Sequence, residues 1–374
     1  MSVSPAELVF PRPPRLLASY ARALRPRRDS AGRTLPARTL RLSRVPHEPA
    51  RLRRYAALCG FPAPSATGRL PATYPHLLAF PLTMRLLTAR DFPHPPLGLV
   101  HLADAIEQSR PLAPDEALSV AVHAEAAEPH PRGTAFAVVA EVRDAAGVVV
   151  WRATSTYLRR GRAGASGDER AGAGARRAGP AGAGAGGAGP MRPWPADAER
   201  SGAQTTGHGH PGTGGLSDGT GRADAGWPAA GTEPDDDRGA GARDGVPPAG
   251  TEQVNGNEPT VTERWALAAD LGRAYARVSG DRNPIHLHPL TARPFGFRRP
   301  IAHGMWTAAR ALAALDEVLP EAFTVNVRFR APAQLPSHPT FHAAPTHDGG
   351  HAFRLTAATG RPLLTGEITP PPPP

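Results

Sequence analysis

A long low-complexity stretch divides this 374-residue chain into two parts. From residue 161 to about residue 258 the sequence consists mainly of Gly, Ala, Pro and scattered charges, including the acidic run Asp235–Asp237. Such a composition cannot bury enough apolar surface to offset the entropy of ordering the backbone. We therefore expect a disordered linker at 161–258, so that any hydrophobic core must come from the segments on either side of it.

The segment before the linker has a helix-then-strands pattern. Apolar residues at Leu99, Leu102, Ala103 and Ile106 recur at helical spacing, which predicts a helix over Leu97–Ser109. Three apolar, strand-like runs follow, the last two joined by a turn at Asp144–Gly147: Leu118–Ala126, Thr134–Arg143 and Val148–Tyr157.

The segment after the linker repeats this outline. We predict helices over Glu263–Arg277 and from about His303 to Val318, then four strands. The first strand alternates strictly between apolar and polar side chains, as a half-buried antiparallel strand does. The predicted strands are Phe323–Arg330, Pro339–Ala344, Ala352–Ala358 and Pro362–Thr369.

The two patterned segments predict an α+β architecture in which each antiparallel sheet wraps around a helix. We divide the chain into an Arg-rich N-terminal segment (1–60), an N-terminal half (61–160), the linker (161–258) and a C-terminal half (259–369). The C-terminal half carries the residues whose chemistry is most specific.

Charge and cysteine content restrict the function and the compartment. The formal net charge is +10, and all 43 basic residues are arginine, densest in the first sixty positions. We expect no nucleic-acid partner, because no binding motif or aromatic platform accompanies these charges. Cys59 is the only cysteine, and no run is apolar enough to span a bilayer, so we expect a cytoplasmic protein without membrane insertion.

One short loop brings an acid and a base together. The run Ser279-Gly-Asp281-Arg-Asn283-Pro-Ile-His286 places a carboxylate and an imidazole five residues apart, where Gly280 and Pro284 interrupt any helix. The two side chains can converge on one water. Taken singly, Asp281 is typical of an Asx turn and His286 of a satisfied loop histidine.

A second motif follows the loop. Pro300-Ile-Ala-His303-Gly304-Met leads into an amphipathic helix. A glycine at a helix N-terminus lets a ligand approach an unpaired N–H at the positive end of the helix dipole, which favours an oxyanion there. Close packing is the alternative reason for Gly304, and we expect His288 and His303 to orient the loop.

At these two motifs the chain resembles the MaoC-like (R)-specific enoyl-CoA hydratase/dehydratase family of double hot-dog type. The family's hydratase motif has an aromatic residue, then Ser-Gly-Asp-x-Asn-Pro-(aliphatic)-His, then a small residue after five more. Tyr275, the loop and Ala292 fill these positions. The resemblance is closest over Trp265–Met305 and looser over the strands that follow and over Tyr74–Arg160.

The resemblance implies a hydro-lyase of fatty acid metabolism. Asp281 and His286 would be the catalytic pair, the Gly304 N–H would bind the thioester oxygen, and Asn283 and Ser279 would support the loop. The substrates would be trans-2-enoyl and (3R)-hydroxyacyl thioesters of coenzyme A or acyl carrier protein. Neither a cofactor nor a metal would be needed, and a homodimer is compatible with such a fold.

The N-terminal half lacks both motifs, and its closest counterpart of the helix start is Pro95–His101. The resemblance implies a non-catalytic half that gives room to the acyl chain. The alternatives left open are a non-catalytic acyl-thioester-binding or scaffold protein and a thioesterase on the same fold. The carrier, the acyl chain length, the physiological direction and the pathway are not encoded in any motif.

Excising Ala163–Gly250 should leave enzymatic activity and melting temperature nearly unchanged, because the closure entropy of a long loop depends weakly on its length. Activity and thermal unfolding of the shortened and full-length chains provide the measurement. Loss of folding on excision would show that the segment is structural.

Overall fold

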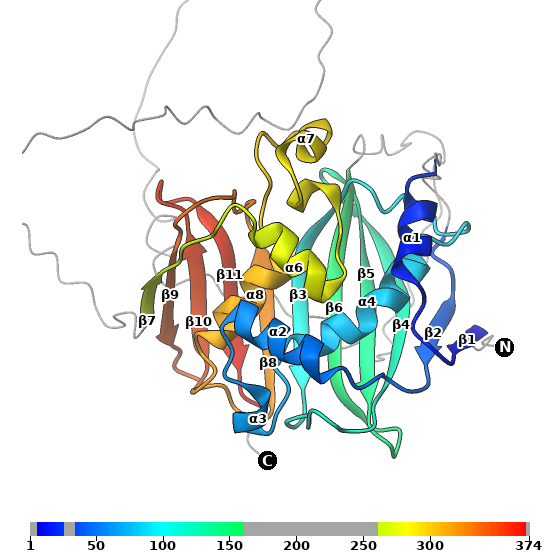
Figure 1. Ribbon diagram of the computed structural model, residues 1–374, viewed down its shortest axis with the longest axis horizontal. Coiled ribbons are helices and arrows are strands. Elements are labelled where there is room, and N and C mark those ends of the chain that lie inside the picture. Colours follow the sequence, from blue (N-terminus) through cyan, green and yellow to red (C-terminus); the bar gives the residue numbers. More distant parts are fainter. Residues whose placement is uncertain (1–5, 26–33, 161–260, 372–374) are drawn as a thin grey trace, which may run out of the picture.

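The computed structural model describes residues 6–25, 34–160 and 261–371, so the predicted linker at 161–258 lies outside the described residues (Figure 1). The elements before the linker are β1 (Ala6–Phe10), α1 (Leu16–Ala23), β2 (Arg38–Leu42), α2 (Pro49–Cys59), α3 (Pro64–Thr67), α4 (Tyr74–Leu87), β3 (Leu99–Gln108), β4 (Ser119–His130), β5 (Gly133–Arg143) and β6 (Val149–Arg160). Those after it are β7 (Val261–Arg264), α6 (Leu271–Ser279), η1 (Pro284–His286), α7 (Pro289–Ala292), η2 (Arg293–Phe295), α8 (Gly304–Ala313), β8 (Phe323–Phe329), β9 (Thr340–Pro345), β10 (His351–Thr356) and β11 (Pro362–Thr369).

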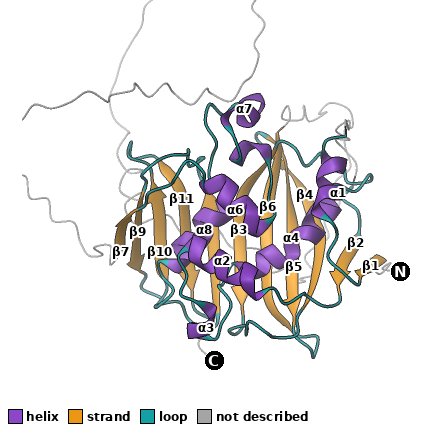
Figure 2. Cartoon of the chain, in the orientation of Figure 1, coloured by secondary structure: helices purple, strands orange, loops and turns teal. Residues whose placement is uncertain are grey.

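The strands form one continuous sheet in the order β1-β2-β4-β5-β6-β3-β8-β11-β10-β9-β7. The two halves meet where β3 pairs antiparallel with β8, from Ala103 opposite Arg328 to Gln108 opposite Phe323. All strand pairs are antiparallel except β1 with β2. The longer helices α2, α4, α6 and α8 lie against one face of this sheet (Figure 2). The predicted α+β double hot-dog architecture is confirmed, with the two sheets merged edge to edge.

Each half wraps its strands around an apolar helix. In the N-terminal half this helix is α4, whose Leu77, Leu82 and Leu86 are at most 1 % exposed and which packs on β4 and β5. A helix that is apolar on nearly all sides is stable only inside a core. In the C-terminal half it is α8, in which Ala308 and Leu312 are fully buried.

The predicted helix over Leu97–Ser109 is wrong, because these residues form strand β3. The register of β3 against β6 shifts between His101 and Ala103, so an extra residue at Leu102 interrupts the alternation. That bulge gives the apolar residues a spacing that imitates a helix, while beyond it Asp104 and Ile106 are buried with a period of two. Pro95–His101 therefore leads into a strand, and the helix of this half lies upstream at α4.

Two helix boundaries in the C-terminal half also differ from the prediction. Residues 261–264 form β7 on the outer side of β9, and the Trp265 and Leu267 N–H groups bond to the Pro339 and Ser337 carbonyls, so the helix begins only at Leu271. α8 ends at Ala313, before the predicted Val318. The strands predicted after it correspond to β8, β9, β10 and β11, and β11 has the predicted bounds.

The arginine-rich first sixty residues contribute to both halves. β2 pairs with β4, and α2 packs against α6 and α8. Trp306 of α8 lies in this contact: its indole N–H donates to the Leu58 carbonyl at 3.1 Å, and its ring meets that of Trp265 edge-on. Among the described residues, no helix is long and apolar enough to cross a membrane.

Candidate active site

The loop between α6 and η1 carries Asp281 and is shaped by its own side chains. Gly280 ends α6 with a φ of +83°, which an L side chain rarely adopts. Ser279 Oγ donates to the Tyr275 carbonyl at 2.8 Å and accepts from the Asp281 N–H at 3.0 Å. The Asn283 N–H then donates to Asp281 Oδ1 at 3.1 Å, which forms an Asx turn.

His286 is held at one ring nitrogen. Its Nδ1 lies 2.7 Å from the Ile301 carbonyl, and since a carbonyl only accepts, Nδ1 carries the proton. The Nε2 atom of the neutral ring is then a proton acceptor. His286 is 8 % exposed, so this nitrogen works in a partly dehydrated environment.

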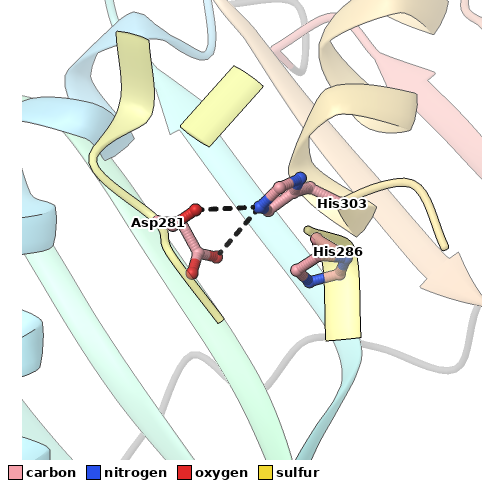
Figure 3. A group of neighbouring side chains, drawn as sticks. All are labelled: Asp281, His286 and His303. Carbon is pink, nitrogen blue, oxygen red and sulfur yellow. Dashed lines mark hydrogen bonds and ion pairs between the residues drawn. The ribbon is translucent and has the colours of Figure 1, made fainter. Parts of the chain in front are cut away.

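His303, the residue before α8, completes the group (Figure 3). Its ring stacks on that of His286 with centroids 3.7 Å apart, and its Nε2–H donates to the Asp281 backbone carbonyl at 3.1 Å. One side-chain nitrogen or oxygen from each of Asp281, His286 and His303 lies within 4.8 Å of the others. A single water can bridge atoms at that separation.

Burial shifts the three groups toward their neutral forms. It raises the pKa of the Asp281 carboxyl, against the opposing influence of the His286 charge and of the hydrogen bond from Asn283. It lowers the pKa of His286, opposed by Asp281 and the Ile301 carbonyl. Burial, and then repulsion from His286, puts the pKa of His303 well below its ordinary value. The Asp281 side chain is 30 % exposed, so water moderates the effect there.

The same three residues offer a ligand set of the kind that zinc accepts. Two histidine ligands of one metal direct their nitrogens at a common point. Here the rings are stacked with only 25° between their planes, so their nitrogens do not converge on one position. This geometry fits a hydrogen-bonded water better than a metal ion.

The N-terminus of α8 lies beside this group, because Gly304 directly follows His303. No hydrogen bond among the described residues uses the Gly304 N–H. A Cβ at this position would lie 2.9–3.1 Å from the ring of Phe329, so only glycine fits. Gly304 is therefore closely packed, and among the described residues its N–H also remains available to a ligand.

The remaining loop residues have local roles. The Asn283 side chain accepts from the Ile285 N–H at 3.4 Å and caps η1, and the His288 side chain caps α7 by accepting from Leu290 at 3.2 Å. Asn283 thus makes its contact with Asp281 through its backbone N–H. Ser279 contacts Asp281 through its side chain, which accepts from the Asp281 backbone N–H.

Residues far away in the sequence hold the loop from outside. The Tyr20 hydroxyl on α1 donates to the Gly280 carbonyl at 2.9 Å and accepts from the Arg282 N–H at 2.7 Å, so it bonds on both sides of Asp281. Arg51 on α2 donates to the Val278 carbonyl at 2.7 Å and to that of Ser279 at 3.3 Å. No motif marks Tyr20 or Arg51, and their separation from the loop by more than 220 positions leaves no sequence signal for either.

Several known proteins are similar to this chain in sequence. Residues 249–338 match the MaoC like domain. The chain is 29 % identical to 3-hydroxyacyl-thioester dehydratase X of Mycobacterium tuberculosis over 335 residues, which cover 89 % of this chain and 90 % of that protein. It is 38 % identical over 65 residues to the (R)-specific enoyl-CoA hydratase of Aeromonas caviae, a match that spans 17 % of this chain and 47 % of that enzyme.

Solved structures extend the likeness to the whole fold. The crystal structure of HtdX of Mycobacterium tuberculosis is similar with a TM-score of 0.59 and 26 % identity, covering 89 % of this chain and all of that one. A MaoC-like dehydratase of Phytophthora capsici has the same fold, with a TM-score of 0.53 at 17 % identity over 88 % of this chain and 93 % of that one. The C-terminal half of the chain therefore contains a MaoC like domain, and the whole chain is similar in sequence and in its double hot-dog fold to these dehydratases.

Proposed function

We propose that the chain catalyses the reversible hydration of trans-2-enoyl thioesters to (3R)-hydroxyacyl thioesters. The observation that carries the proposal is the meeting of Asp281, His286 and His303 within 4.8 Å at the N-terminus of α8. A carboxylate and the free Nε2 of a neutral imidazole both accept hydrogen bonds, so one water can donate to both and turn its oxygen toward the substrate. The names of the dehydratase and hydratase relatives support the same reaction class.

In the hydration direction, the water oxygen attacks Cβ while one of its protons passes to the Asp281/His286 pair. The pair returns a proton to Cα, so both residues end in their starting protonation states. Negative charge accumulates meanwhile on the thioester oxygen. The Gly304 N–H and the positive end of α8 are placed to stabilise that charge. No step of this reaction requires a metal or an organic cofactor.

The carrier of the acyl group is coenzyme A or acyl carrier protein, and both are anionic. The exposed arginines of the loop and of the segment that follows it suit such a carrier; they are Arg282, Arg293, Arg298 and Arg299.

A cytoplasmic location belongs to the same proposal and rests on a single, buried, free cysteine. Initial rates with crotonyl-CoA and with crotonyl carrier protein would distinguish the carriers, and binding of both without turnover would revive the non-catalytic alternative.

Asp281→Asn and His286→Ala should each lower turnover of crotonyl-CoA roughly a hundredfold or more, as expected when a positioned proton-transfer group is lost. Loss of enoyl absorbance gives the rate, and circular dichroism reports whether the fold survives. Asp270→Asn and His338→Ala remove exposed groups of the same types and should retain full activity. If either site variant kept its activity, that residue would have no place in the mechanism.

Tyr20→Phe should lower kcat roughly tenfold or more with a smaller change in KM. The variant keeps the ring but removes both hydrogen bonds to the loop, and displacement of Asp281 by a fraction of an ångström disturbs the reacting geometry. Tyr55→Phe is the matched control, since it removes a buried hydroxyl that bonds to Thr73 at 2.7 Å and to no residue between Ser279 and His286. Equal kcat values for Tyr20→Phe, Tyr55→Phe and the parent would show that the loop keeps its geometry without Tyr20.

A further inference from the structure

A cluster of polar side chains lies on the helix-facing side of the sheet in the N-terminal half, where no hydratase motif occurs. It consists of His101 and Asp104 on β3 and Ser155 and Tyr157 on β6. The strand register places His101 opposite Tyr157 and Asp104 opposite Ser155, so all four side chains can meet on one face. Ser155 Oγ donates to Asp104 Oδ1 at 2.6 Å, and the His101 ring stacks on that of Tyr157 at 4.8 Å.

Two atoms of this cluster are buried without a hydrogen-bond partner among the described residues. They are Asp104 Oδ2 and His101 Nε2, and the latter lies 3.8 Å from Asp104 Oδ1. Asp104 is 1 % exposed, so its second oxygen has lost its hydration without a replacement from the protein. Buried polar atoms are nearly always paired, and an unpaired one indicates a water or a ligand group.

The ionisation of the two residues suits recognition of an oxygen function. Burial raises the pKa of Asp104 to about 7, although the Ser155 hydroxyl opposes the shift. Burial, and then repulsion from His76, lowers the pKa of His101 to about 3. A neutral imidazole beside a carboxyl group that is close to its midpoint can both donate to and accept from a hydroxyl or a carbonyl.

The cluster borders the site in the C-terminal half. The ring of Phe329 lies 4.8 Å from that of His101, and the same ring closes the space beside Gly304. The charge of Asp281 is also near enough to contribute to the raised pKa of Tyr157, after the larger effect of burial. One aromatic ring therefore separates the unpaired atoms of β3 from the N-terminus of α8.

We propose that Asp104 and His101 form a subsite for an oxygen function, a hydroxyl or a keto group, carried by the acyl chain beyond its β-carbon. The proposal rests on the proposed function, because it takes Asp281 and Gly304 as the place where the thioester reacts. An apolar chain seated there would leave both buried atoms unpaired. A site built to bond an oxygen rejects an analogue that lacks it much more strongly than an apolar pocket distinguishes two chain lengths.

The test compares kcat/KM for pairs of trans-2-enoyl-CoA esters of graded length, each with and without a terminal hydroxyl. For at least one length we expect the wild-type chain to prefer the hydroxylated ester by about tenfold or more. Asp104→Leu should abolish or reverse that preference, and His101→Phe, which retains a ring to stack on Tyr157, should weaken it. Asp115→Leu replaces an exposed aspartate and should leave the preference intact.

Equal kcat/KM values for both esters at every length would overturn the subsite, and would indicate that a water fills it. A preference that survives both Asp104→Leu and His101→Phe would overturn it as well, and if Asp104→Leu does not fold, His101→Phe alone decides. Wild-type protein that hydrates neither kind of ester would instead contradict the proposed function. The two failures are thus distinguishable.

Discussion

The loop from Ser279 to His286 depends on hydrogen bonds that come from both the C-terminal half and the Arg-rich N-terminal segment. Within the C-terminal half, Ser279 and Asn283 fold it and His303 holds its Asp281 carbonyl. The Tyr20 hydroxyl bonds to both backbone neighbours of Asp281 from the other side. Each such bond contributes only about 1 kcal/mol, but together they fix a carboxylate that sits outside any helix or strand. The arrangement of acid, base and helix N-terminus follows from this constraint.

Continuity of the sheet makes those contacts possible. Pairing of β3 with β8 joins the two halves into one sheet, and it places the helices of both on the same face. The division of roles then has a physical basis: the C-terminal half carries Asp281 and His286, while the Arg-rich N-terminal segment supplies α1 and α2, which hold their loop. The part of the chain before the linker therefore supports the loop although it contains neither hydratase motif.

Features that depend on residues close together in the sequence could be predicted, and contacts between distant segments could not. Strand β8 and the turn at Asp144–Gly147 could be predicted, because each depends on residues that are neighbours in the sequence. The short spacing of Asp281, His286 and Gly304 likewise predicted that these residues lie close together. The periodicity of Leu97–Ser109 predicted a helix wrongly, because the bulge at Leu102 adds one residue to a strand and gives its apolar side chains a helical spacing. Tyr20, Arg51 and the pairing of β3 with β8 were unpredictable, because each depends on a contact between segments far apart in the chain.

Separating the chain at the linker would show whether the site needs the part that precedes the linker. A fragment of residues 260–374 would be run on a size-exclusion column, alone and after co-expression with residues 1–160. The fractions would then be assayed for hydration of crotonyl-CoA. Alone, its exposed β8 edge and its unsupported loop predict self-association and little activity. With its partner it should elute as a soluble, active complex. A monodisperse and fully active monomer of the C-terminal fragment would show that the site needs no support from residues 1–160.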